Sequence, residues 1–175
     1  ANAAAVTDER AAEDVKRFGV PEEASERKWE RLHDRFDLAK EPNEFNRFGY
    51  LVEINPYDPE SIPVKHTALG RFKHEAGNVF VDKDGTVVCY SGDDARFEYI
   101  YKFVSSKKIK EGDVEHNMTI LDEGTLYVAN LEGNSPASQI TGDGKLPEDG
   151  EFDGTGKWIP LLTATADGVE SHVDG

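Results

Sequence analysis

The chain has 175 residues, enough for one ordinary domain with a core of its own. Its 35 acidic and 20 basic side chains give a formal net charge of -15. Such a negative surface repels phosphodiester backbones and anionic lipid, so we expect neither nucleic acid nor a membrane as a partner. The hydrophobic fraction of 37% and the mean hydropathy of -0.63 are those of a hydrophilic globular protein rather than of a disordered one.

The sequence has one cysteine and only short apolar runs. The single cysteine, Cys89, rules out an internal disulfide, and its place in the apolar run 86–90 favours a buried, inert thiol over a nucleophile or ligand. The sequence contains no apolar run of transmembrane length and no signal peptide. It begins with alanine and ends in the polar stretch 171–175, which suits an excised or incomplete piece.

The first 47 residues predict a helical or extended lead-in. Thr7 can cap a helix over 8–18, which has acidic residues in its first turn and basic residues in its last, before Gly19 and Pro21 end it. The segment 22–35 favours a further helical turn or two. Its apolar positions Trp29, Leu32 and Phe36 follow an i, i+3, i+7 spacing, and we expect them to anchor a core.

From residue 48 onward the pattern changes to short β-strands. The turn Asp82-Lys83-Asp84-Gly85 lacks the remaining ligands of a calcium loop and predicts a hairpin instead. Pro160 favours an edge position for its strand, and the glycine-rich acidic stretch 132–155 predicts a long loop. The expected strands are 50–54, 65–69, 78–81, 86–90, 97–104, 126–131 and 158–161.

This order predicts a mainly β fold, with antiparallel blades of a β-propeller over 48–175 after the lead-in 1–47. A blade uses about 40–45 residues, so the residues after Arg47 supply two or three blades. A closed ring needs at least about four. We therefore expect an incomplete ring that requires the remainder of a propeller chain as its partner.

Acidic side chains lie where predicted strands meet loops, the usual place for metal ligands on a β scaffold. Glu75 follows His74, and Asp93 and Asp94 follow Gly92. Ca²⁺ takes six to eight oxygen ligands gathered from several loops, so these three carboxylates are candidate ligands. From the residues alone, Glu75 could equally be an exposed turn residue, and the two aspartates could form an ordinary turn. If Glu75 faces a metal, its neighbour His74 should pack beside it.

Three basic residues near these acids could hold phosphate oxygens: Arg71, Lys73 and Arg96. Salt-bridged or solvated side chains are the commoner alternative. The sequence contains no glycine-rich phosphate loop and no cysteine-histidine zinc spacing.

Several short motifs, in this order, resemble the PhoX-type alkaline phosphatases. One departure from the family pattern is Ala76-Gly77 after Glu75, where glycine is expected first. The motifs that carry the resemblance are 34–38, 41–44, 46–50, 56–59, 63–65, 67–72, 92–94, 122–129 and 154–161.

The resemblance implies a secreted, periplasmic or extracellular six-bladed propeller that uses calcium and iron to hydrolyse phosphate monoesters, with Glu75 in the metal cluster. The family's iron-binding cysteine lies upstream of the His-Glu segment, whereas Cys89 lies downstream, and the family's Arg-Pro-Glu with its catalytic arginine does not occur here. We therefore expect an interior segment of an enzyme that holds no catalytic residue and is inactive alone. The alternatives are a non-catalytic, calcium-stabilised propeller used for binding and a calcium lactonase propeller, which would hydrolyse esters.

Overall fold

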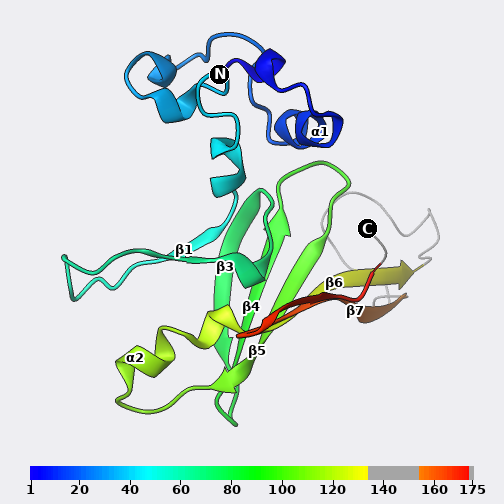
Figure 1. Cartoon of the computed structure of the whole chain (residues 1–175). Helices are drawn as coiled ribbons and strands as arrows, with labels where there is room; N and C mark the ends of the chain where they lie inside the picture. Colours follow the sequence, from blue (N-terminus) through cyan, green and yellow to red (C-terminus); the bar gives the residue numbers. More distant parts are fainter. Residues whose placement is uncertain (134–153, 174–175) are drawn as a thin grey trace, which may run out of the picture. The chain divides into compact units, whose positions relative to one another are not determined.

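The computed structural model describes residues 1–133 and 154–173. The chain forms two compact units, Ala1–His74 and Glu75–Gly175 (Figure 1). The sequence placed a boundary at residue 47 instead. The later position follows from bonds that tie residues 48–74 to the N-terminal segment, including the ion pair of Arg71 with Asp14 at 2.8 Å and the hydrogen bond that the Lys65 ammonium donates to the Arg47 carbonyl.

The N-terminal unit begins with the short 3₁₀ helix η1 (Ala3–Ala5) and the predicted helix α1 (Glu9–Arg17). Its cap is Asp8 rather than Thr7, because the Asp8 carboxylate accepts a hydrogen bond of 2.9 Å from the Ala11 amide. Val15 of α1 is buried with Leu38 and Phe45, and these three side chains form the small core of this unit.

The segment 22–35 turns as predicted, but as the 3₁₀ helices η2 (Trp29–Arg31) and η3 (Asp34–Phe36), which η4 (Glu44–Arg47) follows. The prediction that its apolar residues anchor the core was wrong for Trp29 and Leu32, which are 52% and 77% exposed. An i, i+3, i+7 stripe shares one face only on a continuous α-helix. Here Lys28 takes a left-handed conformation (φ 56°) just before η2, and the chain proceeds in separate 3₁₀ turns.

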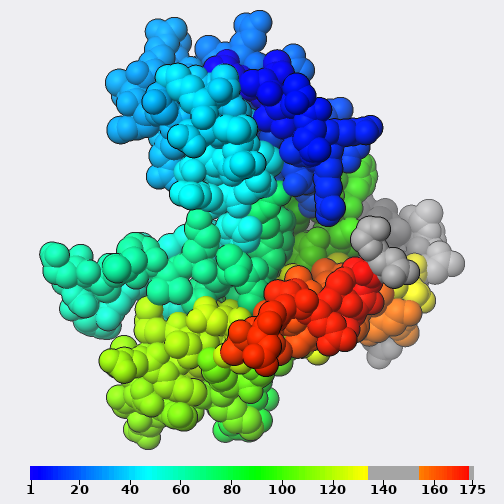
Figure 2. Space-filling model, in the orientation of Figure 1, coloured from blue at the N-terminus to red at the C-terminus, as the bar shows by residue number. Residues whose placement is uncertain are grey.

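Strands β1 (Leu51–Glu53) and β2 (Val64–His66) pair antiparallel in a two-stranded ribbon. The loop between them projects away from the ribbon (Figures 1 and 2). Its Tyr57 and Ile62 side chains are exposed. The strand expected over 65–69 stops at His66, where the 3₁₀ helix η5 (Thr67–Leu69) begins, and Gly70 (φ 85°) reverses the chain after it.

The second unit contains one six-stranded antiparallel sheet in sequence order: β3 (His74–Val81), β4 (Thr86–Asp93), β5 (Ile100–Lys108), β6 (Gly124–Gly133), β7 (Gly154–Thr165) and β8 (Gly168–Ser171). The predicted hairpin at 82–85 is confirmed, with Gly85 at φ 86° and a 2.8 Å bond from the Asp82 amide to the Thr86 carbonyl. Helix α2 (Val114–Asn117), η6 (Ile120–Asp122) and strand β8 were not predicted.

One face of the sheet supplies the buried apolar side chains. Cys89, Phe103 and Leu126 lie in one cross-strand row and are at most 4% exposed. The expectation that Cys89 is buried is thereby confirmed, and burial raises the pKa of its thiol, which disfavours the reactive thiolate.

Pro160 does not lie on an edge strand, which corrects the prediction. Its strand β7 is interior, between β6 and β8. Pro160 lies opposite Tyr127 at a register shift in the β6–β7 ladder, and a bulge is the other place in a sheet that tolerates a residue without an amide hydrogen. The predicted loop 132–155 lies mostly outside the described residues, and its ends at 132–133 and 154–155 belong to β6 and β7.

The expected fold class, mainly β with antiparallel strands and an incomplete ring, is confirmed. The sheet is open, with β3 and β8 at its edges. Val79, Phe80 and Val81 are each more than 40% exposed, so neither face of β3 is covered within the described chain. No helix in the described ranges is long and apolar enough to cross a membrane.

Candidate functional site

Glu75 lies on β3 directly beside the end of β4. Its Cβ is 3.9 Å from the position that a Cβ on Gly92 would take. Gly92 leads into Asp93 and Asp94, so the structure brings the predicted glutamate next to the predicted Gly-Asp-Asp segment. The Glu75 side chain is exposed and makes no ion pair or side-chain hydrogen bond within the described part of the chain.

The backbone beside Glu75 has an unusual conformation. Ala76 takes a left-handed φ of 61°, and its carbonyl accepts a 2.8 Å hydrogen bond from the Ser91 hydroxyl on β4. Glycine adopts this conformation without the Cβ clash that alanine meets. The position where the family resemblance led us to expect glycine is therefore one where the backbone favours glycine.

The two aspartates lie differently from each other. The Asp93 carboxylate accepts a 3.0 Å hydrogen bond from the Ala95 amide, and the Asp93 amide donates to the Tyr99 carbonyl at 3.1 Å. Asp93 therefore fastens the 93–99 loop, as the alternative turn interpretation requires. Asp94 is exposed and makes no ion pair or side-chain hydrogen bond with any described residue.

Alternation along β4 separates Glu75 from Asp93. Neighbouring residues of a strand point to opposite faces, so Asp93 points away from the face that Glu75 shares with Gly92. Within residues 1–133 and 154–173, no three histidine, cysteine or acidic side chains are grouped to hold a metal ion. The exposed carboxylates of Glu75 and Asp94 have the donor chemistry of a hard-cation site, but they do not complete one.

The neighbouring basic and aromatic residues have structural contacts. Arg71 pairs with Asp14 and stacks over Phe18, with its guanidinium carbon 4.5 Å from the ring centroid, so the salt-bridged alternative holds for this residue. The His74 ring packs against the Phe72 ring, with the two ring centroids 3.7 Å apart. Lys73 and Arg96 make no ion pair with a described residue.

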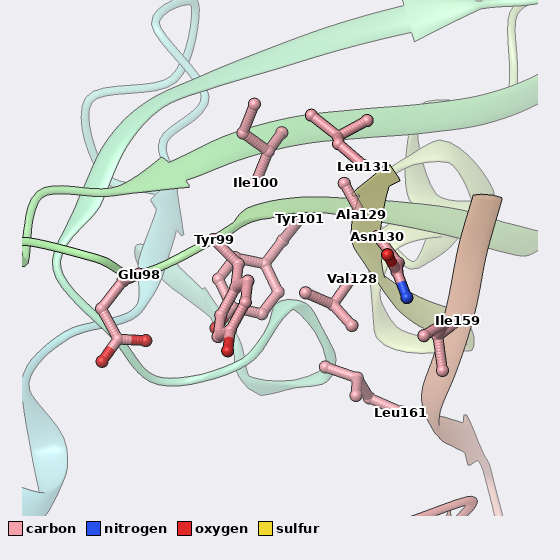
Figure 3. Close-up of a pocket in the computed structure, with 10 residues that line it drawn as sticks. All are labelled: Glu98, Tyr99, Ile100, Tyr101, Val128, Ala129, Asn130, Leu131, Ile159 and Leu161. Carbon is pink, nitrogen blue, oxygen red and sulfur yellow. The ribbon is translucent and has the colours of Figure 1, made fainter. Parts of the chain in front are cut away.

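An open apolar cleft of about 630 Å³ lies where β5 and β6 separate (Figure 3). The ladder between these strands ends at Tyr101 and Val128, whereas β6 stays paired with β7 as far as Gly133. Figure 3 shows Ile100 and Leu131 along one side of the cleft and Glu98 at its end, in the loop that Asp93 fastens. The volume suits a small organic group.

No pattern in the sequence points to this cleft, because its walls come from strands about 30 and 60 residues apart along the chain. The sequence pattern closest to the cleft is the alternation of aromatic and aliphatic residues over 97–104. This alternation predicts a strand, but it does not show that the neighbouring strand β6 separates from it.

The fold and the site define the class of this protein. It is an open antiparallel β scaffold with unpaired carboxylates at the end of a strand. The family model described as alkaline phosphatase PhoX matches residues 2–174, and the chain belongs to this family.

A solved structure, Pseudomonas fluorescens PhoX in complex with vanadate, a transition state analogue, is similar to the chain with 49% sequence identity and a TM-score of 0.62. The similarity covers 76% of this chain and 21% of that chain. The chain thus spans about a fifth of the length of that relative. No curated protein sequence matches it.

Proposed function

We propose that this chain is a segment of a secreted alkaline phosphatase that hydrolyses phosphate monoesters. The observation that carries the proposal is the family match over residues 2–174. The description of the Pseudomonas relative adds support, because vanadate resembles phosphorus at the transition state of phosphoryl transfer. The remaining parts of the active site would come from the rest of the propeller chain, since the similarity covers 21% of that relative.

Glu75 is the residue of this chain that we assign to metal binding first, with Asp94 and Asp93 as further ligands for the calcium and iron that the family resemblance implies. Because Asp93 points away from the face that carries Glu75, these two residues would bind different metal ions. The exposed, unpaired carboxylate of Glu75 supports its assignment, and the hydrogen bond from the Ala95 amide would orient Asp93. When bound, such metals polarise the phosphate and stabilise charge on the leaving oxygen.

The test is Glu75→Gln in the complete enzyme, which keeps the shape of the side chain and removes its charge. We expect bound metal to drop and phosphate release to fall by orders of magnitude while the fold survives. Asp82→Asn is the matched control, because Asp82 is an exposed carboxylate of the 82–85 turn that makes no ion pair within the described chain.

Equal activity and equal metal content in the glutamine variant, the control and the wild type would remove Glu75 from the site. Calcium without iron in the complete protein, together with no phosphate release, would favour the non-catalytic binding propeller instead. Ester hydrolysis without phosphate release would favour the lactonase.

A further inference from the structure

A lysine and three aromatic residues lie together on the sheet face that carries Glu75. The register pairs Tyr90 with Lys102 and Lys102 with Tyr127, and it pairs Ala129, two residues beyond Tyr127, with Trp158. Directly opposed residues of neighbouring strands share a face, as do residues two apart in one strand. We call Tyr90, Lys102, Tyr127 and Trp158 the lysine cluster.

The same alternation connects the lysine cluster to Glu75. Gly92 lies two residues from Tyr90 on β4 and is paired with Ile100, two residues from Lys102 on β5. Because the Cβ of Glu75 lies beside Gly92, Glu75 belongs to this face as well. The face therefore carries a carboxylate proposed for metal binding on β3 and, two strands further along the sheet on β5, a cation.

The aromatic rings hold the Lys102 side chain in place. Its Nζ lies 4.4 Å from the ring centroid of Trp158 and 5.1 Å from that of Tyr127, and the Tyr90 ring lies 6.1 Å from the Trp158 ring. Ring faces attract the ammonium, but they do not replace the oxygen acceptors that its three N–H groups have in water. A cation fixed in this way loses little side-chain entropy when it binds an anion.

The ammonium of Lys102 has no counter-ion among the described residues. Other lysines of this acidic chain do, for example Lys107 with Glu123 and Lys108 with Asp84, both at 2.7 Å. Burial lowers the pKa of Lys102, so the protonated form is left short of stabilising partners. An anion that approached from the partly exposed side of Tyr90 and Trp158 would supply one.

We propose that the lysine cluster is a phosphate-binding subsite in which Lys102 binds and positions the phosphate group of the monoester. This inference rests on the proposed function for the identity of the anion. The site itself needs no turnover and no metal, so it can be tested on the chain alone.

The test uses the fluorescence of Trp158 in the 175-residue chain with Trp29→Phe, since the chain contains two tryptophans. Inorganic phosphate should change the emission of Trp158 saturably, and Lys102→Met should weaken that binding at least tenfold. Lys83→Met is the matched control, because it removes the same charge from the exposed 82–85 turn and should bind phosphate like the parent.

Because Lys102→Met could disturb the sheet, the Lys102 ε-methylene is also followed by carbon-13 NMR in the otherwise unchanged chain. Its chemical shift should move with phosphate along the same saturation curve as the fluorescence. No saturable change in either signal, or equal phosphate affinity for Lys102→Met and Lys83→Met, would overturn the proposal. If Glu75→Gln loses turnover but Lys102 still binds phosphate normally, both the metal-binding role of Glu75 and the phosphate subsite are supported. If Lys102 binds phosphate in a complete protein that has no phosphatase activity, the subsite is supported and the proposed function is refuted.

Discussion

Gly124 lies directly against the ring of Phe103: a Cβ at Gly124 would stand 2.6 Å from Cζ of that ring and 2.3 Å from the carbonyl oxygen of Val104. Real carbon atoms do not approach so closely, and Phe103 is 1% exposed and has no room to withdraw. The start of β6 can therefore reach β5 only with glycine at this position.

Gly124→Ala should consequently destabilise the protein by about 1–3 kcal/mol, the usual cost of overpacking a tight site. The measurement is the midpoint of urea unfolding. Gly92→Ala is the control in the same sheet, because the closest atom to its new Cβ would be 3.9 Å away, and we expect a change below about 0.5 kcal/mol. Equal midpoints for the two variants would contradict the packing that we describe.

Ala76→Gly should stabilise the protein, although most substitutions of alanine by glycine in strands do the opposite. Ala76 is held at φ 61°, where a Cβ costs roughly 1–2 kcal/mol, more than the roughly 0.5–1 kcal/mol of chain entropy that glycine loses. Ala129→Gly, on the ordinary strand β6, is the control and should be destabilising. Thermal unfolding of both variants checks this, and a lower melting temperature for Ala76→Gly would show that the left-handed conformation is not strained.

The elements that the sequence predicted correctly are those that local chemistry determines. The hairpin around Asp82-Lys83-Asp84-Gly85 needs only a turn residue with positive φ between two apolar runs, and α1 needs only a cap and a suitable charge distribution. The proximity of Glu75 to Gly92 follows from that same hairpin.

The elements that the sequence missed depend on non-local pairing. Pro160 is tolerated inside the sheet because it lies at a bulge opposite Tyr127, where the strand does not require a hydrogen bond from its amide. No local sequence pattern predicts that bulge. The lysine cluster could not be predicted either, because it also depends on non-local pairing: the register of three strands places Lys102 next to Trp158.

The ion pair between Asp84 and Lys108 should make stability depend on pH in the acid range. The hydrogen bond from Lys108 (2.7 Å), followed by that from the Thr86 amide (3.0 Å), holds the pKa of Asp84 well below its ordinary value of 3.8. A carboxylate with a depressed folded-state pKa stabilises the fold above its unfolded-state pKa, and this stabilisation is lost as the pH falls through the folded-state pKa.

Asp84→Asn should therefore unfold at a lower urea concentration than the wild type at pH 7, and the difference should shrink progressively below pH 3.8. Asp82→Asn removes the same charge from the same turn without breaking an ion pair, so its midpoint should stay near that of the wild type at pH 7. If the urea midpoints of Asp84→Asn and the wild type differ by the same amount at every pH, the charge of Asp84 is not the cause. The difference would then come from the altered hydrogen bonds of the amide side chain.

Edge strand β3 should make the isolated chain associate when salt is added. Its exposed Val79, Phe80 and Val81 lie on a strand with one side unpaired within the described sheet, which is a template for another strand. The net charge of -15 opposes contact between copies at low salt. Screening shortens that repulsion from about 30 Å at 0.01 M to about 3 Å at 1 M ionic strength, so light scattering should show larger species as salt rises.

Phe80→Lys separates the strand edge from the net charge. It lowers the overall negative charge, which alone would favour association, but it places a charged side chain on the edge, which should prevent strand pairing. We expect this variant to remain monomeric at high salt. Phe97→Lys, which changes the charge equally at a 98% exposed position in the 93–99 loop, should still associate. A wild-type chain that stays a compact monomer at every salt concentration, or equal association of both lysine variants, would mean that β3 is not the contact.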